Sequence, residues 1–284
     1  MTKIRLILLT SFSLVAFAAN SIFCRLALKG TNIDAASFTS IRLFSGAISL
    51  SFLTYATQKK MIISGNWISA FMLFLYAACF SFAYIGLPAA TGALLLFGAV
   101  QITMIGYGFQ IGETLDITKI CGIILAFAGL IYLLMPGIKS PSLLSSIFMI
   151  TAGVAWGIYS LRGTKSNNPT ATTSGNFIRA IPFSIVLNIF MFDNCNLDID
   201  GILLAVLSGV LASGAGYAIW YSVLPIIKST NASVLQLIVP VLASLGGVII
   251  IDEPLTLRII IASIMILLGI SIVLLGKLNS KTNT

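Results

Sequence analysis

Ten apolar runs of about 20 to 25 residues are separated by short polar or glycine- and proline-containing segments. A helix needs about 20 mostly apolar residues to cross the roughly 30 Å of hydrocarbon in a bilayer. Only 8% of the residues are charged, whereas a soluble domain carries about 25%. The expected transmembrane helices span 4–28, 35–56, 67–86, 88–111, 117–136, 141–162, 169–192, 200–224, 228–251 and 256–277. The sequence therefore predicts an all-α polytopic membrane protein.

The first run has some features of a secretory signal peptide. Lys3 and Arg5 precede an apolar stretch that contains Ala16-Phe17-Ala18, which fits a small-residue cleavage site. The apolar run continues well past that site and has a counterpart later in the chain. We therefore expect it to be a transmembrane helix.

An internal repeat links the two halves of the chain. At an offset of 140 residues Glu113 matches Glu253, and at an offset of 137 Arg42 matches Arg179. Apolar segments match by chance, so these charged pairs carry the comparison. They predict two repeats of five helices each, spanning 1–138 and 139–284.

An odd number of helices per repeat fixes how the repeats are related. The second repeat must enter the membrane from the side opposite to the first, so a pseudo-two-fold axis in the membrane plane should relate them. Secondary transporters often have this inverted plan, with the substrate site near the midplane between the halves.

Basic residues indicate the orientation, because lysine and arginine are enriched on the cytoplasmic side. If both termini are cytoplasmic, that side carries Lys3, Arg5, Lys59, Lys60, Lys119, Arg162, Lys165, Lys228, Lys277 and Lys281, and the outer side only Arg25, Lys29, Lys139 and Arg258. We therefore predict a multi-pass protein with both termini in the cytoplasm.

Several kinds of site are not supported by the sequence. It contains no histidine, no Walker-type phosphate loop and no cluster with metal-ligand spacing, and its four cysteines form no C-x-x-C pair. The basic residues are scattered singly, without the patch typical of nucleic-acid binding. We expect no cofactor, no metal and no nucleic-acid partner, and we do not expect an enzyme.

The equivalent ends of the two repeats carry a family resemblance. The segments are I-G-E-T-L at 111–115 and I-D-E-P-L at 251–255, with further typical stretches at 92–101 and 155–163. A helix with a late glycine, Gly129 or Gly269, follows each of the first two, and Pro240 stands thirteen residues before Glu253. In these features the chain resembles the EamA-type ten-helix transporters of the drug/metabolite transporter superfamily. Val100 replaces the proline in the first half.

The resemblance implies export or exchange of a small metabolite across the bacterial inner membrane, driven by a gradient and without ATP. It also implies a central cavity lined by helices 1–4 and 6–9, with helices 5 and 10 at the periphery. The expected partners are the bilayer and a small-molecule substrate, and the chain would act as a monomer or homodimer.

Arg42 and Arg179 are the sharpest site candidates because each lies inside an apolar run. An arginine at the centre of a lipid-facing helix costs roughly 2.5–3.5 kcal/mol on insertion scales. One interpretation is a site for a carboxylate or phosphate, which guanidinium binds in a bidentate way. The alternative is a snorkelling side chain or a structural contact to helix-end carbonyls.

Polar and aromatic side chains within the runs complete the set of cavity candidates. They are Asn20, Tyr84, Gln101, Trp156, Tyr159, Asn176, Tyr217, Trp220 and Gln236. Each could bind substrate, or could make an interhelical hydrogen bond or an interfacial anchor. Glu113 and Glu253 could couple transport to protons, but we expect each of them to cap the helix that follows it.

A secondary transporter working by alternating access is the function that these features favour. The alternatives are a multipass membrane enzyme acting on a lipid-linked substrate, and a non-catalytic membrane partner or small channel. Such enzymes usually need polar loops with paired carboxylates or histidines, and the loops here are too short.

Overall fold

The computed structural model describes residues 2–59, 64–110, 117–135, 141–163, 168–223, 226 and 235–280. The described chain is helical, and no strand occurs within these ranges. Its helices are α1 (Lys3–Gly30), α2 (Ala35–Gln58), α3 (Trp67–Gly86), α4 (Ala89–Gln110), α5 (Ile117–Leu134), α6 (Leu143–Gly163), α7 (Pro169–Phe190), η1 (Phe192–Asn194), α8 (Ile199–Leu207), η2 (Ser208–Ala215), α9 (Gly216–Val223), α11 (Ile238–Ile251) and α12 (Leu257–Ser280).

Polar side chains set where several helices begin. Asp34 caps α2 by accepting hydrogen bonds from two backbone N–H groups, both at 2.9 Å. Asn66 caps α3, and Asn168 caps α7, where a proline occupies the first turn. Asp198 caps α8, and a hydrogen bond from the backbone N–H of Asn32 lowers the pKa of its carboxyl.

The helices identify a multi-pass membrane protein. Six segments are long and apolar enough to cross a bilayer, namely α1, α2, α3, α4, α6 and the continuous stretch from α8 to α9, and shorter apolar helices occur in α5, α11 and α12. This confirms the all-helical membrane fold. The count of ten helices and the division into two repeats stay predictions.

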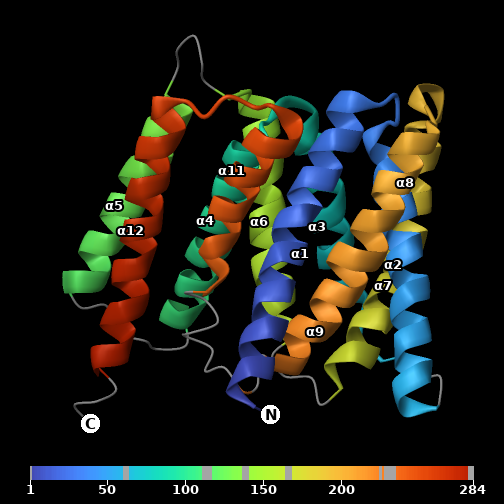
Figure 1. The fold of residues 1–284 in the computed structure, drawn as a ribbon, viewed down its shortest axis with the longest axis horizontal. Helices are drawn as coiled ribbons and strands as arrows, with labels where there is room; N and C mark the ends of the chain where they lie inside the picture. Colours follow the sequence, from blue (N-terminus) through green and yellow to red (C-terminus); the bar gives the residue numbers. More distant parts are fainter. Residues whose placement is uncertain are drawn as a thin grey trace.

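The start of α1 and the end of α12 lie at the same end of the bundle in Figure 1. We call it the terminal end. The opposite end, where α1, α3 and α11 finish, is called the Arg25 end. Helices α5 and α12 pack side by side at one edge (Figure 1). A Cβ at Gly269 would lie 2.5 Å from a backbone oxygen of α5, so only glycine allows this close approach.

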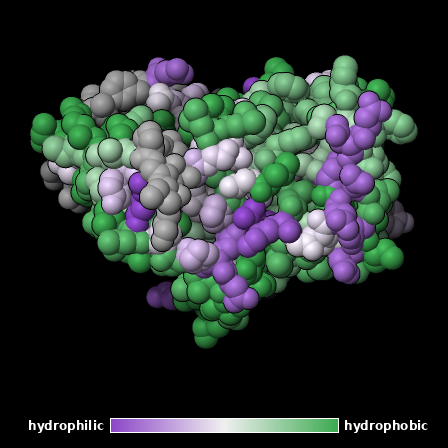
Figure 2. Space-filling view, turned by 90° about the horizontal axis from the view of Figure 1, so that it is seen from above, coloured by the Kyte–Doolittle hydropathy of each residue, from purple (hydrophilic) through white to green (hydrophobic). Residues whose placement is uncertain are grey.

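Large apolar side chains cover the outside of the bundle. Phe52, Phe190 and Ile249 are 72%, 82% and 76% exposed, which only a hydrocarbon solvent makes favourable for so many residues. Figure 2 views the molecule onto the Arg25 end and shows hydrophilic side chains gathered in separate patches on a mostly hydrophobic surface. The core lies between helices, and polar groups inside it define the candidate site.

Candidate functional site

Arg42 lies at the centre of the bundle and is only 1% exposed. Its Nε donates to Ser213 Oγ at 3.3 Å and its Nη2 to Tyr76 Oη at 3.1 Å. The guanidinium carbon lies 5.1 Å and 5.2 Å from the ring centroids of Tyr76 and Phe80. Its Nη1 has no hydrogen-bond partner in the described part of the chain. Arg42 is thus a buried cation held by neutral groups, with one nitrogen still free to donate.

A short hydrogen-bond network extends from this cation. Asn20 Nδ2 donates to the same Tyr76 Oη at 3.1 Å, and Ser208 Oγ donates to Asn20 Oδ1 at 2.6 Å. The network joins α1, α2, α3 and η2. It brings together two predicted candidates, Asn20 and Arg42, through Tyr76, which our sequence analysis missed although it is a polar group within an apolar run.

The segment η2 is a π-helix, and its geometry explains how both of its serines reach the network. Residues five apart stand roughly 140° apart around an α-helix, so Ser208 and Ser213 would face different neighbours. A π-helix bonds residues five apart and brings them to the same side; such segments occur frequently at functional sites. A Cβ at Gly209 would clash with the backbone carbonyl of Arg42, so a glycine is needed for η2 to pack against α2 at this depth.

Aromatic rings enclose a small cavity beside the network. It measures about 20 Å³ and is lined by Phe17, Asn20, Ser21, Tyr76, Phe80, Leu96, Phe97, Trp156, Ala212 and Tyr217. The ring of Trp156 lies between two other lining rings, with its centroid 4.9 Å from those of Tyr76 and Tyr217. We call this cavity and the Arg42 network the central chamber. Its volume suits about one water molecule, so the chamber is closed in this structure.

A second cavity lies toward the terminal end. It measures about 30 Å³ and is lined by Asn66, Ser69, Tyr159, Arg162, Gly163, Pro169, Thr172, Thr173, Asn176 and Tyr221. The ring of Tyr159 lies 5.6 Å from that of Trp156, so these two rings separate the second cavity from the chamber. Asn176 Oδ1 accepts a hydrogen bond from the backbone N–H of Asn66.

The remaining candidates lie at different places. Trp220 packs its ring edgewise on Phe17, 5.7 Å away, beside the chamber. Tyr84 is buried and contacts Phe80 from the Arg25 side, with centroids 4.7 Å apart. Gln101 is buried in α4 and does not line the chamber, and Gln236 is half-buried just before α11.

Arg179, the sequence equivalent of Arg42, is not in the chamber. Its Nη1 donates to the backbone oxygens of Ser64 at 2.7 Å and Gly175 at 3.0 Å. Backbone carbonyls therefore hold this guanidinium, one from the segment before α3 and one from within α7. The structural alternative predicted from the sequence is a contact to helix-end carbonyls. The two arginines therefore have different surroundings despite equivalent positions in the repeat.

Glu253 forms a salt bridge that the sequence did not indicate. Its Oε1 lies 2.7 Å from Nε of Arg25, and its Oε2 accepts a hydrogen bond from the backbone N–H of Ala89 at 2.7 Å. The prediction that Glu253 caps the following helix, α12, is wrong, because the carboxylate points back into the bundle and caps α4. Arg25, which we counted among the basic residues of the outer side, is a buried residue of α1. Glu113 lies outside the described residues.

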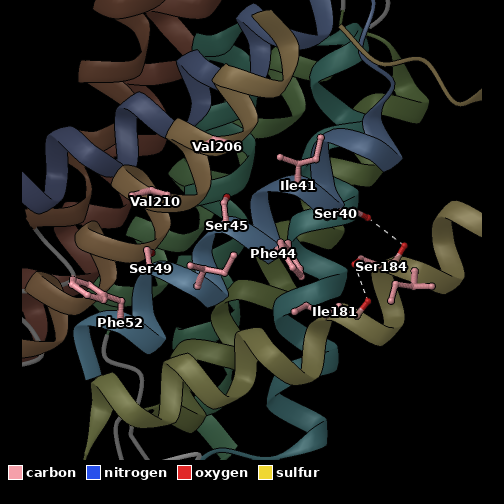
Figure 3. Close-up of a pocket in the computed structure, with 12 residues that line it drawn as sticks. Ser40, Ile41, Phe44, Ser45, Ser49, Phe52, Ile181, Ser184, Val206 and Val210 are labelled. Atoms are coloured by element: carbon pink, nitrogen blue, oxygen red, sulfur yellow. Dashed lines mark hydrogen bonds between the residues drawn. The ribbon is translucent and has the colours of Figure 1, made fainter. Parts of the chain in front are cut away.

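A further cavity is an open groove on the side of the bundle, about 810 Å³ in volume (Figure 3). It is lined by Ser40, Ile41, Phe44, Ser45, Ile48, Ser49, Phe52, Ile181, Ser184, Ile185, Val206 and Val210. The serine hydroxyls donate to backbone carbonyls, such as Ser45 to Arg42 and Ser49 to Gly46. Phe44 and Ile48 are exposed. Hydroxyls already bonded in this way leave a mostly hydrocarbon surface in the groove.

The described helices thus form an apolar multi-pass membrane bundle with a closed polar chamber. The EamA-like transporter family model matches residues 143–275. A protein of Pseudomonas aeruginosa, described as uncharacterised, is 46% identical over 275 residues and covers 96% of each chain. The chain belongs to the EamA-like transporter family.

More distant relatives are described as transporters. The YoaV transporter of Bacillus subtilis is 22% identical over 82% of this chain and 85% of its own. A probable amino-acid metabolite efflux pump of Escherichia coli is 25% identical over 71% of this chain and 72% of its own. One solved crystal structure has the same fold, with a TM-score of 0.65 at 18% identity, over 94% of this chain and 99% of its own.

Proposed function

We propose that the chain is a secondary transporter that exports or exchanges a small metabolite across the bacterial inner membrane by alternating access. The substrate carries a carboxylate together with an apolar or aromatic group. The observation that carries this proposal is the buried Arg42, whose Nη1 has no partner among the described residues.

An anionic substrate would complete the surroundings of Arg42. A buried charge without a counter-ion costs several kcal/mol, and two hydroxyls and two ring faces offset only part of that cost. The one salt bridge among the described residues joins Arg25 and Glu253, so it does not involve Arg42. A carboxylate bound at Nη1 would supply the missing negative charge.

The rest of the chamber favours an apolar or aromatic substrate group. Trp156, Tyr217 and Phe17 present ring faces and edges next to the Arg42 network. Asn20 adds an amide. An amino acid fits this chemistry, and the name of the Escherichia coli relative points in the same direction.

The packing of the helices supports two inverted halves of five helices, 1–138 and 139–284. Helices at equivalent places in the two halves pack on each other in the pairs α2–α7, α4–α11 and α5–α12. Other contacts between the halves also occur twice. The third helical segment of each half packs on the first helix of the other half, as α3 on α6 and as α8 and η2 on α1. The fourth helix of each half does the same, as α4 on α6 and as α11 on α1. A pseudo-two-fold axis produces this pattern.

The terminal end would face the cytoplasm, since the predicted orientation places ten basic residues there and four at the other end. Asp193, Asp198 and Asp200 then lie on the outer side. The closed chamber of about 20 Å³ is too small for an amino acid. A cycle must therefore open it to each side in turn.

Transport by purified protein in liposomes tests the proposal. The panel contains aromatic and aliphatic amino acids, nucleosides and S-adenosyl compounds, under proton, sodium and exchange gradients. We expect uptake of at least one carboxylate-bearing solute, with phenylalanine as the first probe. Empty liposomes are the control. Absence of transport for every solute and gradient would overturn the proposal.

A further inference from the structure

The contacts of Arg25 and Glu253 join the two halves at one end of the chamber. Arg25 Nε binds Glu253 Oε1 at 2.7 Å, and Arg25 Nη1 donates to the backbone oxygens of Tyr84 at 2.7 Å and Ile85 at 3.0 Å. Glu253 Oε2 accepts from the N–H of Ala89. One ion pair thus holds α1, the end of α3, the start of α4 and the end of α11.

The backbone directs Glu253 into this position. Asp252 ends α11 in the left-handed conformation, with φ of 55° and ψ of 35°, which is unusual for a residue other than glycine. The turn lets the N–H of Glu253 donate to the oxygen of Gly247 at 3.0 Å. The chain therefore reverses here and points the carboxylate toward α1 instead of toward water.

Everything between this ion pair and the central chamber is closely packed. Cys24 and Tyr84 are 0% exposed, and Ser21 is 1% exposed. Tyr84 contacts Phe80, which lines the chamber. A solute could reach the chamber from the Arg25 end only if the ion pair and this layer separated.

The opposite end of the chamber is held differently. There the exposed Arg162 donates to Ser69 Oγ at 3.0 Å and to Asn66 Oδ1 at 3.1 Å, and no salt bridge occurs at this end within the described ranges. Among the described residues, the ion pair is therefore the one salt bridge between the halves in this state. Its side chains are only 11% and 6% exposed, so the pair is largely shielded by the surrounding helices in this state.

We propose that Arg25 and Glu253 form a gate latch, an ion pair that keeps the chamber closed toward the Arg25 end and breaks once in each transport cycle. This inference rests on the proposed function. It assigns Glu253 to gating between the halves, in place of a local helix cap.

A reversible cross-link tests whether this end must open. An ideal Cβ at Gly247 would lie 3.2 Å from the Cβ of Ala89, close to the roughly 3.5–4.5 Å that a disulfide spans. The variant combines Ala89→Cys and Gly247→Cys with the native cysteines replaced by alanine. Oxidation should lower counterflow of radiolabelled phenylalanine at least tenfold, and a reductant should restore it. The two single-cysteine variants should be insensitive to oxidation.

The native Cys24 provides a second readout that needs no substrate. It is kept as the sole cysteine, and a membrane-impermeant maleimide is added from the Arg25 side. Glu253→Gln should raise the labelling rate at least tenfold, since the amide oxygen can still cap α4 while the ion pair is lost. Arg258→Gln is the matched control, because this half-buried arginine donates to a carbonyl at the same end, and its labelling should not change. Chromatography and thermal melting verify that each variant is folded.

The outcomes separate the latch from the proposed function. If the reduced protein moves no solute, the transporter proposal fails while the labelling test still decides whether the pair closes this end. Full counterflow in the oxidised cross-linked protein would overturn the latch alone. Equal Cys24 labelling in Glu253→Gln and the unchanged protein would also overturn it.

Discussion

Replacing Arg42 by glutamine should weaken substrate binding without unfolding the protein. The guanidinium has one nitrogen without a partner in the described structure, and a carboxylate bound there would make at least one charge-assisted hydrogen bond. Such a bond contributes about 1.5–3 kcal/mol. Its loss should raise the Kd of phenylalanine roughly 10- to 150-fold.

The empty protein should tolerate the same change. Glutamine removes a buried charge that has no salt-bridge partner within the described residues, so its melting temperature should stay level or rise. Binding can be followed by the fluorescence of Trp156, whose ring lines the chamber, with the amide of phenylalanine as the ligand that lacks a carboxylate. The amide should bind Arg42→Gln and the unchanged protein about equally.

Arg179→Gln is the matched control. Arg179 donates to two backbone carbonyls outside the chamber, so this variant should lose stability and keep its affinity for phenylalanine. Equal losses of affinity in the Arg42 and Arg179 variants would refute the reasoning, as would an equal loss for phenylalanine and its amide.

Three further predictions concern the surroundings of the chamber. Ser213→Ala removes a hydrogen bond to the buried guanidinium and should raise Kd about 5- to 10-fold, whereas Ser222→Ala, on the exposed side of α9, should leave it unchanged. Gly209→Ala would drive a methyl group into a serine hydroxyl and a carbonyl of α2 and should lower the melting temperature by several degrees, while Gly106→Ala, with open space around it, should not lower it. Asp198 has a lowered pKa, so its contribution to stability is present above about pH 4 and is lost as the pH falls through the lowered value. Thermal melts between pH 6 and pH 3 should show this loss, and Asp198→Asn should reduce that pH dependence.

Helix positions were predictable because local chemistry decides them. The run predicted at 67–86 is α3, Trp67–Gly86, since Asn66 caps its start and a proline follows its end. The prediction for 200–224 also located a long helical stretch, but not the π-helical segment within it. That segment depends on the contact of Gly209 with α2, which no local pattern reveals.

The site was less predictable because its partners are distant in sequence. Arg25 and Glu253 are 228 positions apart, and charge counting used Arg25 only as a basic residue of the outer side. Tyr76 links Asn20 to Arg42, yet nothing in the sequence distinguishes it from other aromatic residues of the runs. Polar residues inside apolar helices could be identified as site candidates from the sequence. Which of these residues contact one another could be seen only in the packed structure.

The difference between Arg42 and Arg179 shows how a repeated sequence can produce a single site. Next to Arg42, Gly209 lets η2 approach and present a serine hydroxyl, which leaves one guanidinium nitrogen free. Next to Arg179, Gly175 has no Cβ to exclude the backbone of Ser64, whose oxygen binds the guanidinium instead. Both glycines permit close approach of two segments. At Gly209 this approach brings a serine side chain of η2 to the arginine, and at Gly175 it brings a backbone carbonyl. The chamber therefore holds one anion anchor, and we expect one carboxylate to bind per chain.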